Sequence, residues 1–364
     1  MVEFVKLKRQ YDCFAVEYEE AALRAMRSGW YIMGKELETF EAQFADYLNR
    51  RFCIGLNSGL DALTLAVRAL GIGPGDEVIV PANTYIASVL GVTENGAVPV
   101  FVEPDEYFCL NADRVEEAIT DRTKAILPVH LYGQPCDMEK ICAVAQKHGL
   151  YVIEDCAQSH GARLNGKLTG TFGTIGCFSF YPTKPLGALG DSGAVVTDDP
   201  VLADRLRKLR NYGSGVKYVN ELEGVNSRLD EVQAALLQVG LKHLEEGNEY
   251  RNRIAARYLA EMRNPLIILP QKRPGADHVY HVFGVLCEQR DNLQKHMADC
   301  GVKTLIHYPI PPHLQQCYAH LGHGAGDFPI AEAYAHRELS LPIYVGMPDE
   351  DVDRVIAAVN SFRG

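Results

Sequence analysis

Two stretches decide the fold, IEDCAQSHGA at residues 153–162 and GCFSFYPTKP at residues 176–185. The first ends an apolar, strand-like run with an acid, Asp155, and the second follows another such run with a lysine, Lys184. In open α/β sheets, ligands bind beyond the carboxyl ends of the strands. The pattern therefore predicts a site that contains both an acid and a lysine.

An acid and a lysine are two partners that pyridoxal phosphate (PLP) chemistry requires. The lysine amine bonds to the cofactor aldehyde, and a carboxylate keeps the pyridine nitrogen protonated so that the ring accepts electrons. Strand-end acids and surface lysines are common, so the spacing alone leaves a purely structural role for Asp155 and Lys184 open.

Composition limits the classes of function. A length of 364 residues favours two packed domains. The net charge is -11, with 36 basic against 47 acidic residues, and this argues against a nucleic-acid partner. No apolar run reaches the roughly 20 residues of a membrane span, and Met1–Asp12 lacks a signal-peptide core. The ten cysteines are scattered. We therefore expect a cytoplasmic chain with reduced thiols and no membrane partner.

One group of residues is compatible with metal binding. Its members are His313, Cys317, His320 and His323. Because no second ligand pair accompanies them, we interpret them as part of a loop and a helix edge, and we expect no metal.

Short apolar runs separated by helical segments indicate parallel strands with crossover helices. The runs are 77–80, 98–102, 125–129, 150–153 and 175–180. They predict an α/β protein whose large domain has three layers, α/β/α. A helix from Leu229 to Met262, with Gly240 and Gly247 as weak points, leads into a smaller α+β domain. We place the domains at 1–245 and 246–364.

The motifs IEDCAQSHGA, FSFYPTK and GDSGAVVT, in this order and spacing, resemble those of the DegT/DnrJ/EryC1/StrS family of sugar aminotransferases. The resemblance extends over nearly the whole chain. LIHYPIPPHL, at residues 305–314, resembles the branch that aminates C3 of keto-deoxysugars. The resemblance implies fold type I, like aspartate aminotransferase, and a homodimer with shared active sites.

The resemblance also implies which residues hold PLP. Lys184 bonds to the cofactor, Asp155 contacts the pyridine nitrogen, and Gln158 binds O3'. The phosphate is held by Ser179, by Asn226 of a neighbouring subunit, and by the amides of Gly59 and Leu60, which open a helix. The family often has threonine at position 60, so Leu60 offers only its N–H. Tyr85 stacks on the ring, although the sequence alone equally permits a core tyrosine.

Substrate residues follow from the same resemblance. Trp30, Tyr31 and Lys35 lie in or beside an aromatic turn, and the alternative for Trp30 is a position in the core. Lys217 and Arg228 lie in the long polar loop 211–231. His307, Tyr308 and His313 lie in the C-terminal domain. A solvated loop charge is the alternative for Lys217. His160 could serve either proton traffic or packing.

The implied reaction is PLP-dependent transfer of an amino group from L-glutamate, with release of 2-oxoglutarate, to C3 of a dTDP-3-keto-6-deoxyhexose. The product, a dTDP-3-amino-3,6-dideoxyhexose, would serve glycan biosynthesis such as lipopolysaccharide O-antigen. Alternatives are a C4 aminotransferase on a UDP- or dTDP-4-keto-6-deoxy sugar, a non-catalytic PLP-binding regulator, and an interaction protein on an inactive fold. A regulator needs an output element, which is not evident, and an inactive fold should have lost Lys184 or Asp155.

Overall fold

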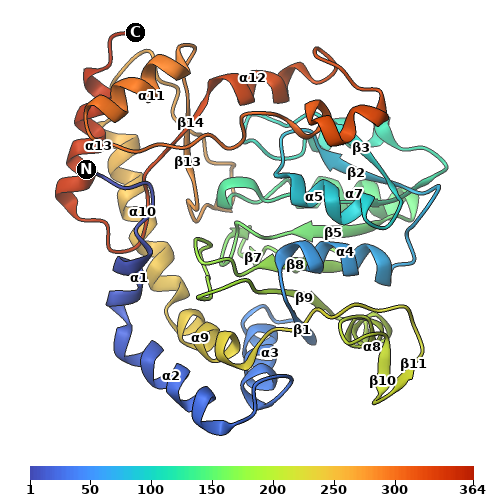
Figure 1. Ribbon diagram of the computed structural model, residues 1–364. Coiled ribbons are helices and arrows are strands. Elements are labelled where there is room, and N and C mark those ends of the chain that lie inside the picture. Colours follow the sequence, from blue (N-terminus) through green and yellow to red (C-terminus); the bar gives the residue numbers. More distant parts are fainter.

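The computed structural model describes residues 1–364 and is built around a seven-stranded sheet (Figure 1). The strands lie in the order β1-β9-β8-β5-β4-β2-β3. β3, β2, β4, β5 and β8 are parallel, whereas β9 is antiparallel to both of its neighbours. Their bounds are β1 Phe52–Leu56, β2 Glu77–Pro81, β3 Val98–Val102, β4 Thr123–Ile126, β5 Tyr151–Asp155, β8 Ile175–Ser179 and β9 Gly193–Thr197.

Helices cover both faces of this sheet, as predicted. On β2, Val78 and Val80 pack into the core shared with α4, α5 and α8, while Ile79 faces the opposite core with α7. Each fully buried Val or Ile side chain contributes about 1.5–3 kcal/mol. α3 and α9 complete the second face near β8 and β9. The bounds are α3 Lys35–Tyr47, α4 Gly59–Ala69, α5 Ile86–Thr93, α7 Met138–His148, α8 Pro200–Leu209 and α9 Glu231–Lys242.

The C-terminal part has its own core, around the antiparallel pair β13 and β14. Val2 lies in this core and bridges to Val302, so the first residues pack with the last third of the chain. The elements are α10 Leu244–Glu261, β13 Phe283–Leu286, α11 Arg290–Asp299, α12 Pro329–Arg337, β14 Glu338–Leu341 and α13 Asp349–Ser361. The boundary at residues 245 and 246 falls within α10 and stays a prediction.

Two elements differ from expectation. The helix expected from Leu229 to Met262 is two helices, and the break lies at His243 rather than at a glycine. The His243 ring stacks on Phe14 at 3.7 Å and its Nε2 lies 3.0 Å from Glu17 Oε1, so tertiary contacts set the break. The loop 211–231 contains a hairpin of β10, Ser214–Val216, and β11, Val219–Asn220.

The other helices and strands include the long N-terminal helix α2 and several short elements. They are α1 Leu7–Cys13, α2 Ala15–Ser28, α6 Ala112–Val115, β6 Arg163–Leu164, β7 Lys167–Leu168 and β12 Ala276–Asp277. α2 ends at Gly29, which has φ 70, a left-handed conformation that favours glycine. None of the helices combines the length and the apolar composition needed to cross a bilayer.

Candidate active site

The carboxyl ends of the parallel strands bring the predicted residues to one rim. Asp155 is the last residue of β5, Ser179 is the last residue of β8, and Lys184 follows in the next loop. Tyr85 follows β2 and caps the N-terminus of α5. Because neighbouring strands run in the same direction, these residues converge without any special local structure.

Asp155 is buried and held by two donors. The Ser88 hydroxyl donates to Oδ2 at 2.8 Å, and the backbone N–H of Ala157 donates to Oδ1 at 3.1 Å. Burial raises the pKa of Asp155, and the two hydrogen bonds and the positive charge of Lys184 oppose that rise. A buried carboxylate held in this way forms a strong charge-assisted bond with a cationic N–H partner.

Lys184 lies in an environment that favours its neutral amine. Burial lowers the pKa of Lys184 to about 8, while the charge of Asp155 acts in the opposite direction. A lysine with a lowered pKa is a better nucleophile and proton acceptor near neutral pH. The pair therefore provides a reactive amine close to a buried acid.

The N-terminus of α4 and Ser179 form a cradle that fits a phosphate group. Ser58 caps the helix by accepting the Asp61 N–H at 3.1 Å, whereas the N–H groups of Gly59 and Leu60 have no partner in the chain. A Cβ on Gly59 would lie 2.4 Å from the Cβ of Ser179, so only glycine permits this approach. Free helix N–H groups beside a hydroxyl bind phosphate well.

Tyr85, Gln158 and Tyr308 lie together at the same rim. The Tyr85 and Tyr308 ring centroids are 5.1 Å apart, and Tyr85 is 53% exposed, which excludes a core role. Gln158 Nε2 donates to the Tyr308 hydroxyl at 3.1 Å, and its Oε1 accepts the Tyr132 N–H at 2.6 Å. These contacts fix the orientation of the Gln158 amide.

His307 is positioned by a chain of hydrogen bonds. Its Nδ1 lies 2.8 Å from Ser340 Oγ, and Ser340 in turn donates to Glu338 Oε1. Burial raises the pKa of Glu338 to about 8. Ser340 Oγ therefore links the His307 ring to a buried carboxyl, and Nε2 is the ring nitrogen left for a ligand. Burial and the charge of Lys184 lower the pKa of His307 to about 4, so the ring is neutral at pH 7.

His160 packs rather than transfers protons. It is buried, its ring lies 5.4 Å from that of Phe178 and 5.6 Å from that of Phe180, and neither ring nitrogen has a side-chain or backbone partner. Burial, with the charges of Lys184 and Arg251, lowers its pKa to about 3.

The aromatic turn before α3 is exposed and firmly held. Trp30 is 64% exposed, so the alternative of a core tryptophan is excluded; Tyr31 and Lys35 are exposed as well. Glu231 of α9 accepts backbone N–H groups of this turn and of the first turn of α3, including Gly34 at 2.7 Å. The turn therefore presents a fixed aromatic surface to the outside of the chain.

Three predicted residues lie on the 211–231 segment, and none of them forms a hydrogen bond with Lys184. Lys217 is exposed at the tip of the β10–β11 hairpin, which projects away from the C-terminal domain (Figure 1). Asn226 is exposed, and Arg228 donates to Asn211 Oδ1 at 3.1 Å and lies over the Tyr212 ring. Contacts of these side chains with a substrate remain predictions.

His313 does not line the rim. It is buried, its Nε2 lies 3.1 Å from Glu332 Oε1, and its ring packs against Phe101 and Phe328. The position of this residue in a substrate cleft, expected from its motif, is therefore not reproduced, because the segment after Pro312 turns into the domain core.

A buried trio with metal-binding side chains, His130, Glu154 and Cys156, serves the fold instead. His130 Nε2 lies 3.0 Å from Glu154 Oε2, and Glu154 also accepts three backbone N–H groups, of Gly170, Phe172 and Gly173. Its acceptor positions are thus occupied by the chain itself.

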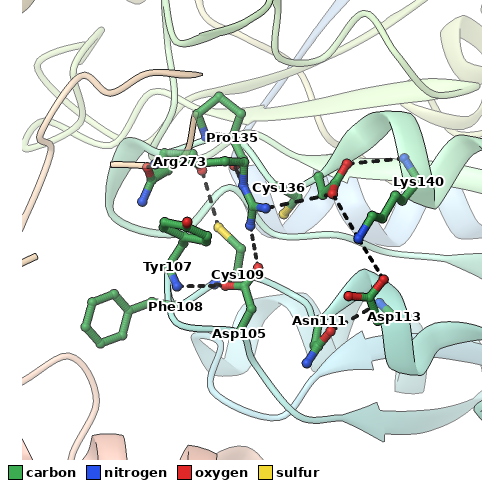
Figure 2. Close-up of polar contacts among 12 residues, drawn as sticks. Asp105, Tyr107, Phe108, Cys109, Asn111, Asp113, Pro135, Cys136, Lys140 and Arg273 are labelled. Atoms are coloured by element: carbon green, nitrogen blue, oxygen red, sulfur yellow. Dashed lines mark hydrogen bonds and ion pairs between the residues drawn. The ribbon is translucent and has the colours of Figure 1, made fainter. Parts of the chain in front are cut away.

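A surface hollow of about 410 Å³ is lined mainly by charged and polar residues. Figure 2 shows Arg273 reaching Asp105 while Lys140 approaches Asp113 at 2.7 Å. Arg273 also lies 4.4 Å from the Tyr107 ring centroid. Because both cations of this hollow are paired with carboxylates, we assign no anionic ligand to it.

Sequence reasoning missed the residues that orient the site. Ser88 holds Asp155, and Ser340 with Glu338 holds His307. Ser88 could have been found, since it lies in the first turn of the helix that follows Tyr85. No local signal connects Ser340 with His307, which lie 33 residues apart in the sequence.

Comparisons with known proteins agree with this geometry. The profile described as the DegT/DnrJ/EryC1/StrS aminotransferase family matches residues 12–360. The dTDP-3-amino-3,6-dideoxy-alpha-D-galactopyranose transaminase of Aneurinibacillus thermoaerophilus is 51% identical over 100% of this chain and 99% of its own length.

Solved structures agree too. DesV of S. venezuelae has a TM-score of 0.97 and 51% identity, covering 99% of this chain and 97% of its own. NtdA of Bacillus subtilis, solved with its bound cofactor pyridoxamine phosphate (PMP), has a TM-score of 0.90 and 33% identity, covering 98% of this chain and 83% of its own. The chain belongs to the DegT/DnrJ/EryC1/StrS aminotransferase family.

Proposed function

We propose that this protein is a PLP-dependent aminotransferase that moves the amino group of L-glutamate to C3 of a dTDP-3-keto-6-deoxyhexose. The observation that carries the proposal is the joint presence of Lys184, Asp155 and the Gly59–Ser179 cradle at one rim. The choice of C3 and of a dTDP-sugar is supported by the name of the Aneurinibacillus relative.

Residues at the rim would hold the cofactor by its phosphate, its pyridine nitrogen and its ring. The amides of Gly59 and Leu60 and the Ser179 hydroxyl hold the cofactor phosphate, and Asp155 holds a proton at the pyridine nitrogen. Tyr85 covers the ring, and Gln158 donates to O3'. When bound, PLP accepts the amino group from the donor and later passes it to the sugar ketone.

Lys184 would act as the base that moves a proton at the donor Cα and, in the second half-reaction, at the sugar carbon. With a pKa of about 8, a useful fraction of its amine is neutral at pH 7. His307, held neutral, and Tyr308 are proposed to bind the sugar ring, with Nε2 of His307 hydrogen-bonded to a hydroxyl group.

We propose a homodimer with shared sites. The aromatic turn and the hairpin expose large apolar side chains, among them Trp30, Ile32, Tyr218 and Val219, which a second copy could cover. In that dimer Lys217, Arg228 and Asn226 would reach the partner's site. There the two cations would bind the sugar diphosphate and Asn226 would bind the cofactor phosphate.

All ten cysteines are free, which supports action in the reducing cytoplasm.

Lys184 and Asp155 argue against a purely structural protein, and nothing in the geometry of the site favours a regulator or a C4 aminotransferase. The decisive experiment records the visible absorption of the PLP-loaded protein before and after L-glutamate, and then after a dTDP-3-keto-6-deoxyhexose, with mass analysis of the sugar. Loss of the visible band with glutamate, its return with the sugar and a 3-amino product support the proposal. A band indifferent to glutamate contradicts the donor, and a 4-amino product from a 4-keto sugar contradicts the position.

A further inference from the structure

A cavity of about 130 Å³ adjoins the Lys184 loop on the side of the C-terminal domain. Its polar walls are Gln10, Thr183, Arg251, His281, His307 and Tyr344. Thr183 immediately precedes Lys184, and the charge of Lys184 lowers the pKa values of both His281 and His307. The cavity therefore lies close to the reacting amine.

Arg251, on α10, is a buried cation with no carboxylate partner. Its Nε donates to the Val279 carbonyl at 3.1 Å and its Nη2 donates to Asn248 Oδ1, but Nη1 has no hydrogen-bond partner. A buried charge without a counter-ion is costly, since desolvation is not compensated. Burial accordingly lowers the pKa of Arg251 to about 10. An anion in the cavity would compensate this charge.

Tyr344 adds a second free donor. The side chain is 4% exposed, and its hydroxyl has no partner. Buried hydroxyl groups are almost always hydrogen-bonded, so an unpaired one on a residue that lines a cavity indicates a missing acceptor. No aspartate or glutamate lines the cavity, although the chain carries a net charge of -11. The walls of the cavity thus favour an anion that accepts hydrogen bonds.

The volume decides which anion fits. A nucleotide-linked sugar needs a larger site, because pockets for drug-sized ligands span roughly 300–1,000 Å³. The guanidinium fork matches the planar geometry of a carboxylate. We propose that this cavity binds a carboxylate group of the amino donor, and of the 2-oxo acid formed from it, with Arg251 as the charged partner and Tyr344 as a hydrogen-bond donor. The assignment to the donor rests on the proposed function.

Glutarate tests the cavity, because it has both carboxylates of the donor but neither an amine nor a ketone that could react. Its affinity for the PLP-loaded protein is measured by calorimetry, with inorganic phosphate at equal ionic strength as the comparison. We expect glutarate to bind, Arg251→Lys to weaken it by about tenfold or more, and Tyr344→Phe to weaken it by about three- to tenfold. The KM for L-glutamate should rise more in Arg251→Lys than in Tyr344→Phe, and the KM for the sugar should stay unchanged in both variants.

Two variants of the same helix serve as controls. Arg253→Lys and Tyr250→Phe change a cation and a hydroxyl outside the cavity; Tyr250 donates to the Met347 carbonyl at 2.7 Å. Both should keep the wild-type affinity for glutarate. Melting temperatures without ligand identify any variant that folds poorly, and Tyr344→Phe, which removes only an unpaired hydroxyl, should fold normally.

The outcomes separate the two proposals. Absence of glutarate binding to the wild type, equally tight binding of phosphate, or unchanged affinity in Tyr344→Phe and Arg251→Lys would overturn the carboxylate site. If glutarate binding depends on both residues but L-glutamate leaves the visible band unchanged, the carboxylate site stands and the proposed donor fails.

Discussion

His307 Nδ1 and Ser340 Oγ lie 2.8 Å apart, on two segments that meet only in the folded C-terminal domain. Ser340 Oγ is in turn hydrogen-bonded to Oε1 of the buried Glu338, whose pKa burial raises to about 8. A single hydroxyl therefore occupies Nδ1 of His307 and leaves Nε2 as the nitrogen available to a ligand.

Ser340→Ala should lower kcat/KM for the keto sugar by about three- to tenfold, which corresponds to about 1 kcal/mol for one lost hydrogen bond. The donor half-reaction should keep its rate, because Lys184 and Asp155 are untouched. Steady-state kinetics with the sugar varied checks this. Ser340→Thr keeps the hydroxyl and is the matched control; equal losses in both variants would contradict the role of the hydroxyl.

Gly59→Ala should weaken PLP binding by about tenfold or more, because its Cβ would lie 2.4 Å from the Ser179 Cβ and would force the phosphate cradle apart. Equilibrium titration of cofactor-free protein with PLP measures the change. Gly73→Ala places its Cβ in ordinary contact, 3.5 Å from the nearest atom, and should bind PLP normally. Wild-type affinity in Gly59→Ala would show that the cradle is not the phosphate site.

Asp155→Asn should retain the cofactor and lose most of its rate, because a neutral amide cannot hold the pyridine nitrogen protonated. We expect kcat to fall about 100-fold or more, as for loss of an acid–base partner. Occupancy is measured by releasing PLP from denatured protein, and kcat by sugar amination. Asp113→Asn, at an exposed surface pair, is the control. Unchanged kinetics would remove Asp155 from this role.

Lys184→Ala should lose at least about 1,000-fold in turnover, since both the covalent link and the base disappear. The fold should remain, because Lys184 makes no side-chain hydrogen bond to another residue in the chain and truncation of such a residue has a small effect. Turnover and thermal unfolding are measured in parallel with Lys167→Ala, an exposed lysine on β7. Near-normal turnover in Lys184→Ala would exclude the proposed mechanism.

The rate at which cofactor-free protein recaptures PLP should depend on pH through Lys184. Only the neutral amine attacks the aldehyde, and with a pKa of about 8 the neutral fraction rises about tenfold per pH unit below pH 8 and levels off above it. Stopped-flow absorbance from pH 6 to 10 follows this rate. A rate that continues to rise beyond pH 10 would indicate an ordinary lysine, and a flat profile would exclude attack by this amine as the measured step.

Much of the large domain is predictable because its signals are local. The parallel strands are apolar on both faces, and the rule for strand ends then brings Asp155 and Lys184 to one rim. α4 and its cap are similarly local, since Ser58 and Asp61 lie three residues apart. The retained lysine and acid are readable from the sequence alone.

What could not be predicted depends on contacts between distant segments. Arg251 donates a hydrogen bond to the Val279 carbonyl. Glu231 accepts the N–H of Gly34, which lies 197 residues away in the sequence. The helix break at His243 has no glycine or proline to mark it. Such partners depend on tertiary packing, which hydrophobic periodicity does not encode.

The bridge between Val2 and Val302 also bears on how the protein is made. A ribosome releases Val2 long before Val302 exists, so this pairing closes only after about 300 further residues have been synthesised. The seven-stranded sheet, whose residues all precede position 198, can assemble first. The C-terminal core, and with it the cavity around Arg251 and Tyr344, would then form last. A nascent chain would therefore form the rim that carries Asp155 and Lys184 before it forms this cavity.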